Sequence, residues 1–313
     1  MSNVVNGFEH VAPDTRARVL EAVERLSYHP SELAHSLKVG RSGLIGLMLP
    51  ELDTPYFAEL TRAFVEQGTE HGMTVVIDQT DGDRCREISW IQRAAGGSLF
   101  DGLLLSPLAL QAADLGVLSA DNPVVFLGEN PYPGFDKVMV DNFAAANEAV
   151  VHLASRGHRR IGAIGPEQAI QGASTQRFAG YRSGLAQTSL TFDERYVAII
   201  DNFHRDQGYR AMTSLLDQPT PPDAVFCFSD PLALGALRAL HERGIDVPGE
   251  IAVVGFDDIE DGRFSTPSLT SISPDKSWLA ATAFDRLIRR LNGEHLEPET
   301  ILAPYRLEIR EST

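Results

Sequence analysis

Charged and aromatic side chains with complementary binding chemistry stand at separate points of this chain. They include an arginine, Arg177, the adjacent acids Asp257 and Asp258, and the aromatic pair Tyr56 and Phe57. A guanidinium group donates several hydrogen bonds, carboxylates accept them, and aromatic faces pack against the apolar face of a ring. If these residues converge, they would suit a polyhydroxylated or polar ring ligand.

Strands that alternate with helices would position these residues. Apolar runs predict strands at 44–49, 74–77, 102–105, 124–127, 138–140, 161–164, 196–200, 224–228 and 251–254. Stretches of helical period lie between them, as at 57–70, 144–155, 176–186 and 231–242. This alternation is typical of doubly wound parallel sheets. The element order of 44–140 recurs over 161–258, so we predict two similar α/β lobes in tandem.

The candidate binding residues follow the predicted strands. Ligands of open parallel sheets bind beyond the carboxyl ends of the strands, so two facing lobes would gather these residues in one cleft. The polar and aromatic residues at these positions are Tyr56, Phe57, Ser106, Glu129, Arg177, Asn202, Phe203, Ser229, Asp257 and Asp258.

Each candidate also has a plainer interpretation. Asp257 and Asp258 could be turn residues, and the aromatic pair at 56–57 could belong to a core. A lone arginine on a helix is more often a surface charge. We expect Glu129 to be a solvated loop acid. The set therefore carries more weight than any member.

Composition and charge limit the function classes. The chain has 313 residues, 43% of them hydrophobic and 22% charged, as in folded α/β proteins of more than one lobe. A formal net charge of -16 argues by itself against nucleic-acid binding. Residues 1–41 hold five basic and five acidic side chains, so the deficit lies after Arg41. Any DNA affinity must therefore come from a small, local element.

Several kinds of site and segment are not indicated by the sequence. Cys85 and Cys227 lack the spacing of a disulfide framework or zinc site, and Cys227 stands in an apolar run typical of a buried thiol. The N-terminus does not resemble a signal peptide, and no apolar run reaches membrane-spanning length. No GxGxxG or GxSxG motif follows a strand. We therefore expect a cytoplasmic protein that has no enzymatic activity, metal, cofactor or membrane association.

The first 41 residues have a different, helical pattern. Pro13 and Asp14 begin one predicted helix, which His29-Pro30 ends. Ser31 can cap a second short helix over 32–37, and a linker follows. We therefore predict a DNA-binding segment over 1–41 and an effector-binding and dimerisation domain over 42–313.

Ordered motifs across nearly the whole chain resemble the LacI/GalR (lactose-repressor) family of transcription regulators. They include YHPS at 28–31, AHSLK at 34–38, PYFAEL at 55–60, GHRRI at 157–161, RFAGY at 177–181, VGFDD at 254–258 and PSLTSI at 267–272. The resemblance implies a two-lobed, type I periplasmic-binding-protein-like core whose chain crosses between the lobes three times. The N-lobe would take about 44–142 plus 275–304, and the C-lobe about 143–274 plus 305–313.

The resemblance also implies a function. It implies a DNA-binding regulator, a repressor, whose operator affinity is controlled by a small polar effector, a sugar, between the lobes. Effector contacts would come from Tyr56, Phe57, Arg177, Phe203, Ser229 and Asp257. A homodimer would bind a pseudo-palindromic operator. The alternative is a stand-alone sugar-binding protein of the periplasmic type. The motifs at 28–38, which resemble the hinge of the family, and an N-terminus unlike a signal peptide both disfavour it.

The DNA contacts implied by the family fall in the first segment. They are Ser2, Asn3, Asn6, Ala34, His35 and Leu37. Leu37 matches a hinge leucine that wedges into the minor groove and kinks the duplex, although it could instead be a core contact of a short helix. His35 stands where relatives carry arginine, and its mostly neutral ring would contact phosphate more weakly.

The start of the chain also departs from the family, whose helix-turn-helix opens about twenty residues upstream of the motif resembling 2–7. A GTG codon read as a start instead of as valine would produce this sequence, and so would a deletion.

We predict that the 313-residue chain binds DNA weakly. The resemblance implies that the chain starts inside the recognition helix of the helix-turn-helix, and the first helix, which normally buries the recognition helix, is missing. An upstream extension that supplies this helix should raise operator affinity sharply and steepen its salt dependence. Fluorescence anisotropy of both proteins with one operator duplex, over a series of salt concentrations, measures this. Nanomolar, sequence-specific binding by the 313-residue chain would contradict the prediction.

Overall fold

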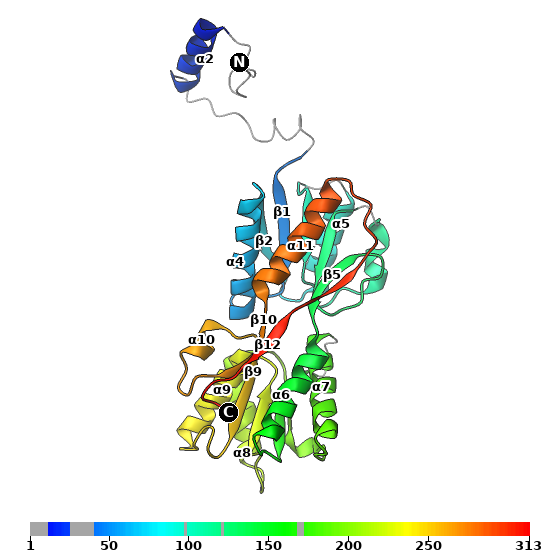
Figure 1. Ribbon diagram of the computed structural model, residues 1–313. Helices are drawn as coiled ribbons and strands as arrows, with labels where there is room; N and C mark the ends of the chain where they lie inside the picture. The colour runs from blue at the N-terminus through cyan, green and yellow to red at the C-terminus, as the bar shows by residue number, and fades with distance from the viewer. Residues whose placement is uncertain (1–11, 26–40, 97–98, 120–121, 168–171) are drawn as a thin grey trace.

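The computed structural model describes residues 12–25, 41–96, 99–119, 122–167 and 172–313. Helix α2 (Pro13–Arg25) lies apart from two stacked lobes (Figure 1). The predicted helix at 32–37 lies outside the described residues. So do the six predicted DNA contacts, Ser2, Asn3, Asn6, Ala34, His35 and Leu37.

The lobe next to α2, the N-lobe, contains a six-stranded parallel sheet of order β11-β5-β4-β3-β1-β2. Its strands are β1 (Leu44–Leu49), β2 (Thr74–Gln79), β3 (Gly102–Leu105), β4 (Val124–Leu127), β5 (Asp136–Val140) and β11 (Thr300–Ala303). Its helical elements are α4 (Pro55–Glu70), α5 (Arg84–Ala95), η1 (Ala112–Val117) and α11 (Lys276–Leu291). Strands β3 and β4 are buried along their whole length, as expected of parallel strands covered on both faces.

The second lobe, the C-lobe, repeats this plan with a sheet of order β12-β10-β9-β8-β6-β7. Its strands are β6 (Ile161–Glu167), β7 (Val197–Ile200), β8 (Ala224–Cys227), β9 (Ala252–Phe256), β10 (Thr270–Pro274) and β12 (Tyr305–Glu308). Its helical elements are α6 (Asn142–Ser155), α7 (Ala173–Gln187), η2 (Glu194–Tyr196), α8 (Arg205–Leu216), α9 (Asp230–Glu242) and α10 (Glu260–Arg263). Strand β12 pairs antiparallel with β10, which departs from the otherwise parallel prediction.

The chain crosses between the lobes three times, after β5, after β10 and after β11 (Figure 1). Helix α11 follows a C-lobe strand but packs against α4 and the N-lobe sheet. Buried Asp136 anchors it there, with its two carboxylate oxygens each 2.5 Å from a nitrogen of Arg286 or Arg290. These guanidinium groups hold the pKa of Asp136 below its usual value despite burial. The prediction of a two-lobed, type I periplasmic-binding-protein-like fold is confirmed.

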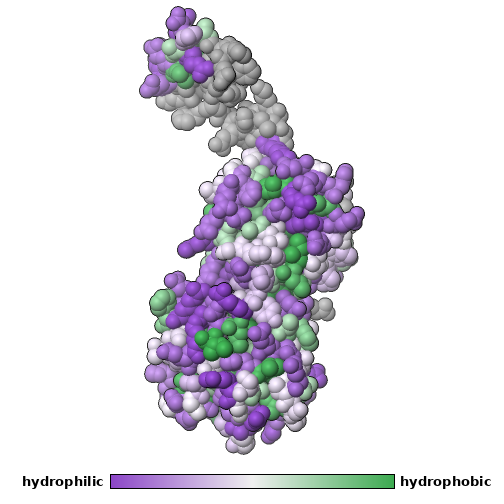
Figure 2. Space-filling model, in the orientation of Figure 1, coloured by the Kyte–Doolittle hydropathy of each residue, from purple (hydrophilic) through white to green (hydrophobic). Residues whose placement is uncertain are grey.

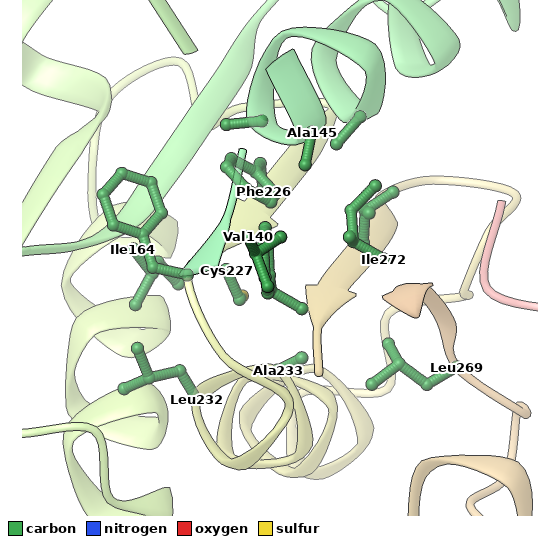
Figure 3. Packing of buried hydrophobic residues seen from close by; sticks show 14 of the residues in the cluster. Val140, Ala145, Ile164, Phe226, Cys227, Leu232, Ala233, Leu269 and Ile272 are labelled. Atoms are coloured by element: carbon green, nitrogen blue, oxygen red, sulfur yellow. The ribbon is translucent and has the colours of Figure 1, made fainter. Parts of the chain in front are cut away.

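Apolar packing fixes the helices against the C-lobe sheet. Figure 3 shows Val140, Ala145, Phe226 and Ile272 packed in one core, together with the predicted buried thiol of Cys227. Helices α8 and α9 approach so closely that a Cβ added at Gly235 would lie 2.0 Å from the carbonyl oxygen of Arg205. This packing fixes where α8 and α9 begin, next to the ends of β7 and β8.

The face of the two lobes shown in Figure 2 is mainly hydrophilic, with small hydrophobic patches. Within the described ranges, no helix is long and apolar enough to cross a membrane.

Candidate functional site

Arg177 lies at the centre of the candidate site and is not the surface charge that a lone arginine often is. Helix α7 carries it one turn beyond Gly172, whose φ of 115° lets the chain turn into the helix. Arg177 is only 8% exposed, and its guanidinium carbon lies 3.5 Å from the ring centroid of Phe256. A buried guanidinium group that stacks on an aromatic face is held in one orientation.

The donors of Arg177 are only partly used within the protein. Its Nε donates to Oδ1 of Asn142 at 2.6 Å, and its Nη1 donates to the carbonyl oxygen of Phe228. Its Nη2 lies 3.9 Å from Oδ1 of Asp257, beyond hydrogen-bond distance. Within the described part of the chain Nη2 makes no hydrogen bond, so its donors can reach a ligand.

The turn that follows β9 separates the roles of the two adjacent aspartates. Asp257 and Asp258 have φ angles of 111° and 47°, where residues other than glycine are uncommon. The carboxylate of Asp258 is 2.6 Å from Arg310 and 3.0 Å from Arg263, so Asp258 holds the turn in place. Asp257 is 5% exposed, and its carboxylate makes no hydrogen bond with any described residue. The turn interpretation therefore fits Asp258, whereas Asp257 presents free acceptors.

Lys276, the first residue of α11, also supports this turn from beyond the crossing that follows β10. Its Nζ donates to the backbone oxygen of Asp257 at 2.6 Å and lies 2.8 Å from the carboxylate of Glu59. The first residues of α11 and α4 are thereby tied to the C-lobe turn.

Burial raises the pKa of several acids around Arg177. Desolvation raises the pKa of Asp257 to about 6, although the charges of Arg177 and Lys276 oppose the shift. Desolvation likewise raises the pKa of Glu167, at the end of β6, to about 7. Desolvation raises the pKa of Glu129 as well. For all three carboxyls the positive charge of Arg177 opposes this rise but does not cancel it. The charge of one guanidinium group therefore acts on three buried acids.

Glu129 was expected to be a solvated loop acid, and that expectation was wrong. It follows β4, is half-buried, and accepts a hydrogen bond from Nδ2 of Asn142 at 2.7 Å. Because Asn142 also accepts from Arg177, it bridges an N-lobe acid to a C-lobe cation. Asn142 was not among the predicted site residues. Its position directly beyond β5, at the same sheet edge as the other candidates, was the signal that could have found it.

The other predicted effector contacts have different neighbours. The rings of Tyr56 and Phe57 meet edge to face at 5.2 Å, and both pack partly buried against the core. Burial raises the pKa of Tyr56, and the charges of Asp257 and Glu129 raise it further, so Tyr56 shares their environment.

Ser229 and Phe203 make local contacts. Ser229 caps α9 by accepting from the backbone nitrogen of Leu232 at 3.4 Å, and Phe203 packs against the core. Tyr56, Arg177 and Asp257 therefore come together. For Phe57, Phe203 and Ser229, the contacts found among the described residues are those of packing and capping.

A separate groove of about 470 Å³ lies beside the crossings. Its lining includes Glu59, Arg263, Lys276 and Tyr305, but neither Arg177 nor Asp257. Lys276 is paired with Glu59 and Arg263 with Asp258, so these charges are already used within the protein. The residues around Arg177 offer more free hydrogen-bonding groups and are the stronger candidate.

Comparison with known proteins finds similar sequences and structures. The model of the periplasmic binding protein-like domain matches residues 150–313. The HTH-type transcriptional repressor PurR of Yersinia enterocolitica is 33% identical over 100% of this chain and 92% of its own length.

Solved structures agree with the sequence matches. A LacI-family transcriptional regulator from Sanguibacter keddieii is 39% identical with a TM-score of 0.79, covering 87% of this chain and 98% of that one. The transcriptional regulator CelR in complex with cellobiose is 30% identical with a TM-score of 0.77, covering 100% and 94%.

We predict that Asp257→Asn stabilises the protein at pH 8 and not at pH 4. Because the folded-state pKa of Asp257 is raised, its favourable contribution is complete below pH 4 and is lost as the pH rises through about 6. The neutral amide avoids this loss, so the free energy of unfolding at pH 8 should rise by about 1–3 kcal/mol. Urea unfolding at both pH values measures the change.

Asp258→Asn is the matched control for this substitution. Arg310 and other partners hold the pKa of Asp258 below its usual value, so its contribution is present above pH 4 and is lost on acidification. Removing that charge should destabilise the protein at pH 8. Equal urea midpoints for the native protein and Asp257→Asn at pH 8 would contradict the prediction.

Proposed function

The chain belongs to the LacI/GalR family of transcription regulators, and from this we propose that it is a DNA-binding repressor controlled by a small polyhydroxylated effector. The observation that carries the proposal is the buried pair of Arg177 and Asp257, whose free donors and acceptors face each other. Together they can orient neighbouring hydroxyl groups through charge-assisted hydrogen bonds. The cellobiose complex of CelR supports a sugar as the class of effector.

The match to the repressors named PurR favours a regulator over a stand-alone binding protein. It covers 100% of this chain and therefore includes residues 1–41, which a bare two-lobed binding protein would not need. We propose a DNA-binding segment over 1–41 and an effector domain over 42–313, with the lobe ranges given above. We further propose DNA contacts at the six residues already named, a cytoplasmic location and no catalytic activity.

Effector control would act through the angle between the lobes. Two hydrogen bonds, from Asn142 to Glu129 and from Arg177 to Asn142, link the lobes, so a ligand held there would favour one lobe arrangement. In a dimer this would change the spacing of the two hinge segments and so the fit of Leu37 to the operator.

We predict that Arg177→Ala and Asp257→Asn each weaken effector binding about thirtyfold, since each removes a buried charge-assisted partner worth roughly 2 kcal/mol. Thermal shifts across sugars, beginning with cellobiose, and nucleobases identify a ligand, and calorimetric titration then gives its affinity. The affinity for operator DNA, measured with and without this ligand, tests the regulatory role.

Arg182→Ala is the control for these titrations, because Arg182 is an exposed residue of the same helix. It should leave effector affinity unchanged. Unaltered affinity in both Arg177→Ala and Asp257→Asn would place the effector elsewhere.

We also predict a homodimer formed through the two-lobed body, because two hinge segments must meet over a pseudo-palindromic site. Sedimentation velocity at micromolar concentration measures the state. A monomer with no concentration dependence, or a stable tetramer, would count against it.

A further inference from the structure

Acidic side chains outnumber the basic ones around Arg177 in the described part of the chain. Three described carboxyls, those of Glu129, Glu167 and Asp257, lie close enough for the charge of Arg177 to act on each. Other cations nearby are already engaged. Lys276 pairs with Glu59, which leaves little of its charge for the cleft.

Two further groups do not remove this excess. Lys137 donates to the backbone oxygens of Glu129 and Asn130, at 3.3 and 3.4 Å, and compensates Glu129 only in part. His204 lies 3.7 Å from a carboxylate oxygen of Glu51, a further acid whose charge raises the pKa of Glu167. An anionic ligand would therefore enter a buried site in which desolvation already opposes the ionisation of Glu129, Glu167 and Asp257, and further negative charge there would be weakly screened.

Glu129 is placed to recognise donors on a ligand. One of its carboxylate oxygens, Oε1, accepts from Asn142, and the backbone amide of Glu129 itself also favours the carboxylate, whereas no other described residue donates to Oε2. The same Asn142 holds Nε of Arg177, so Glu129 is fixed relative to the pair of Arg177 and Asp257. A ligand that bridges the lobes meets a free acceptor on the N-lobe side and a free donor and acceptor on the C-lobe side.

We propose that Glu129 sets the charge class of the effector, so that the cleft takes neutral and amine-bearing polyols and rejects phosphorylated or carboxylated ones. This inference rests on the proposed function, since it concerns the same cleft. An ammonium group near Glu129 would neutralise the buried charge, whereas a hydroxyl group would only donate a hydrogen bond. Amine-bearing ligands should therefore bind at least as tightly as their neutral counterparts.

Matched sugars in three charge states test the proposal. Glucose, galactose and mannose are compared with glucosamine, galactosamine and mannosamine and with the hexose phosphate esters, by thermal shift and then calorimetric titration. In the native protein, the phosphate ester should bind at least about tenfold more weakly than the amino sugar of the same skeleton. Glu129→Gln keeps the acceptor for Asn142 but removes the charge, and should reduce this ratio to about threefold or less.

Glu66→Gln, at an exposed position of α4, is the matched control and should leave the ratio unchanged. Phosphate esters that bind as tightly as the amino sugars would overturn the proposal, and so would a ratio unaffected by Glu129→Gln. The absence of a shift with every neutral and amino sugar would overturn the ligand class. Operator binding, measured separately, would still decide whether the protein is a DNA-binding regulator.

Discussion

The cleft depends on one buried positive charge, the guanidinium group of Arg177. A charge that is 8% exposed must be compensated by hydrogen bonds and stacking, and here Asn142, the carbonyl oxygen of Phe228 and the ring of Phe256 provide them. These partners come from α6, from the end of β8 and from β9, so the position of Arg177 requires the whole carboxyl edge of the C-lobe sheet to be assembled. The cleft is therefore a product of the complete fold, not of any single loop.

The sequence predicted the architecture well because buried parallel strands leave a strong local signal. Runs such as 102–105 and 124–127 are apolar throughout, since helices cover both of their faces. Strand β12 was not among the predicted strands, because its alternating YRLE pattern is short and its partner β10 is distant in the chain.

Long-range contacts explain what the sequence could not resolve at the site. Nothing local distinguishes Asp257 from Asp258, and their roles separate only because Arg310 reaches Asp258 from 52 residues away. Glu129 was misjudged for the same reason, since its hydrogen-bond donor Asn142 lies beyond the next strand. Arg177 and Asp257 were found because Asp257 stands directly beyond β9 and Arg177 lies near the start of the helix that follows β6, at the same edge of the sheet.

The left-handed backbone at Asp257 limits how this protein can evolve new ligand preferences. At a φ of 111°, branched or bulky side chains are strongly disfavoured, so the accessible replacements are chiefly glycine and asparagine. On the N-lobe side the positive φ falls on Gly128, which precedes Glu129. The backbone of Glu129 itself is therefore free of this restriction. Divergence within this lineage would therefore be channelled to the N-lobe wall of the cleft, with the C-lobe aspartate as an inherited fixed point. A biosensor engineer would randomise the same wall first.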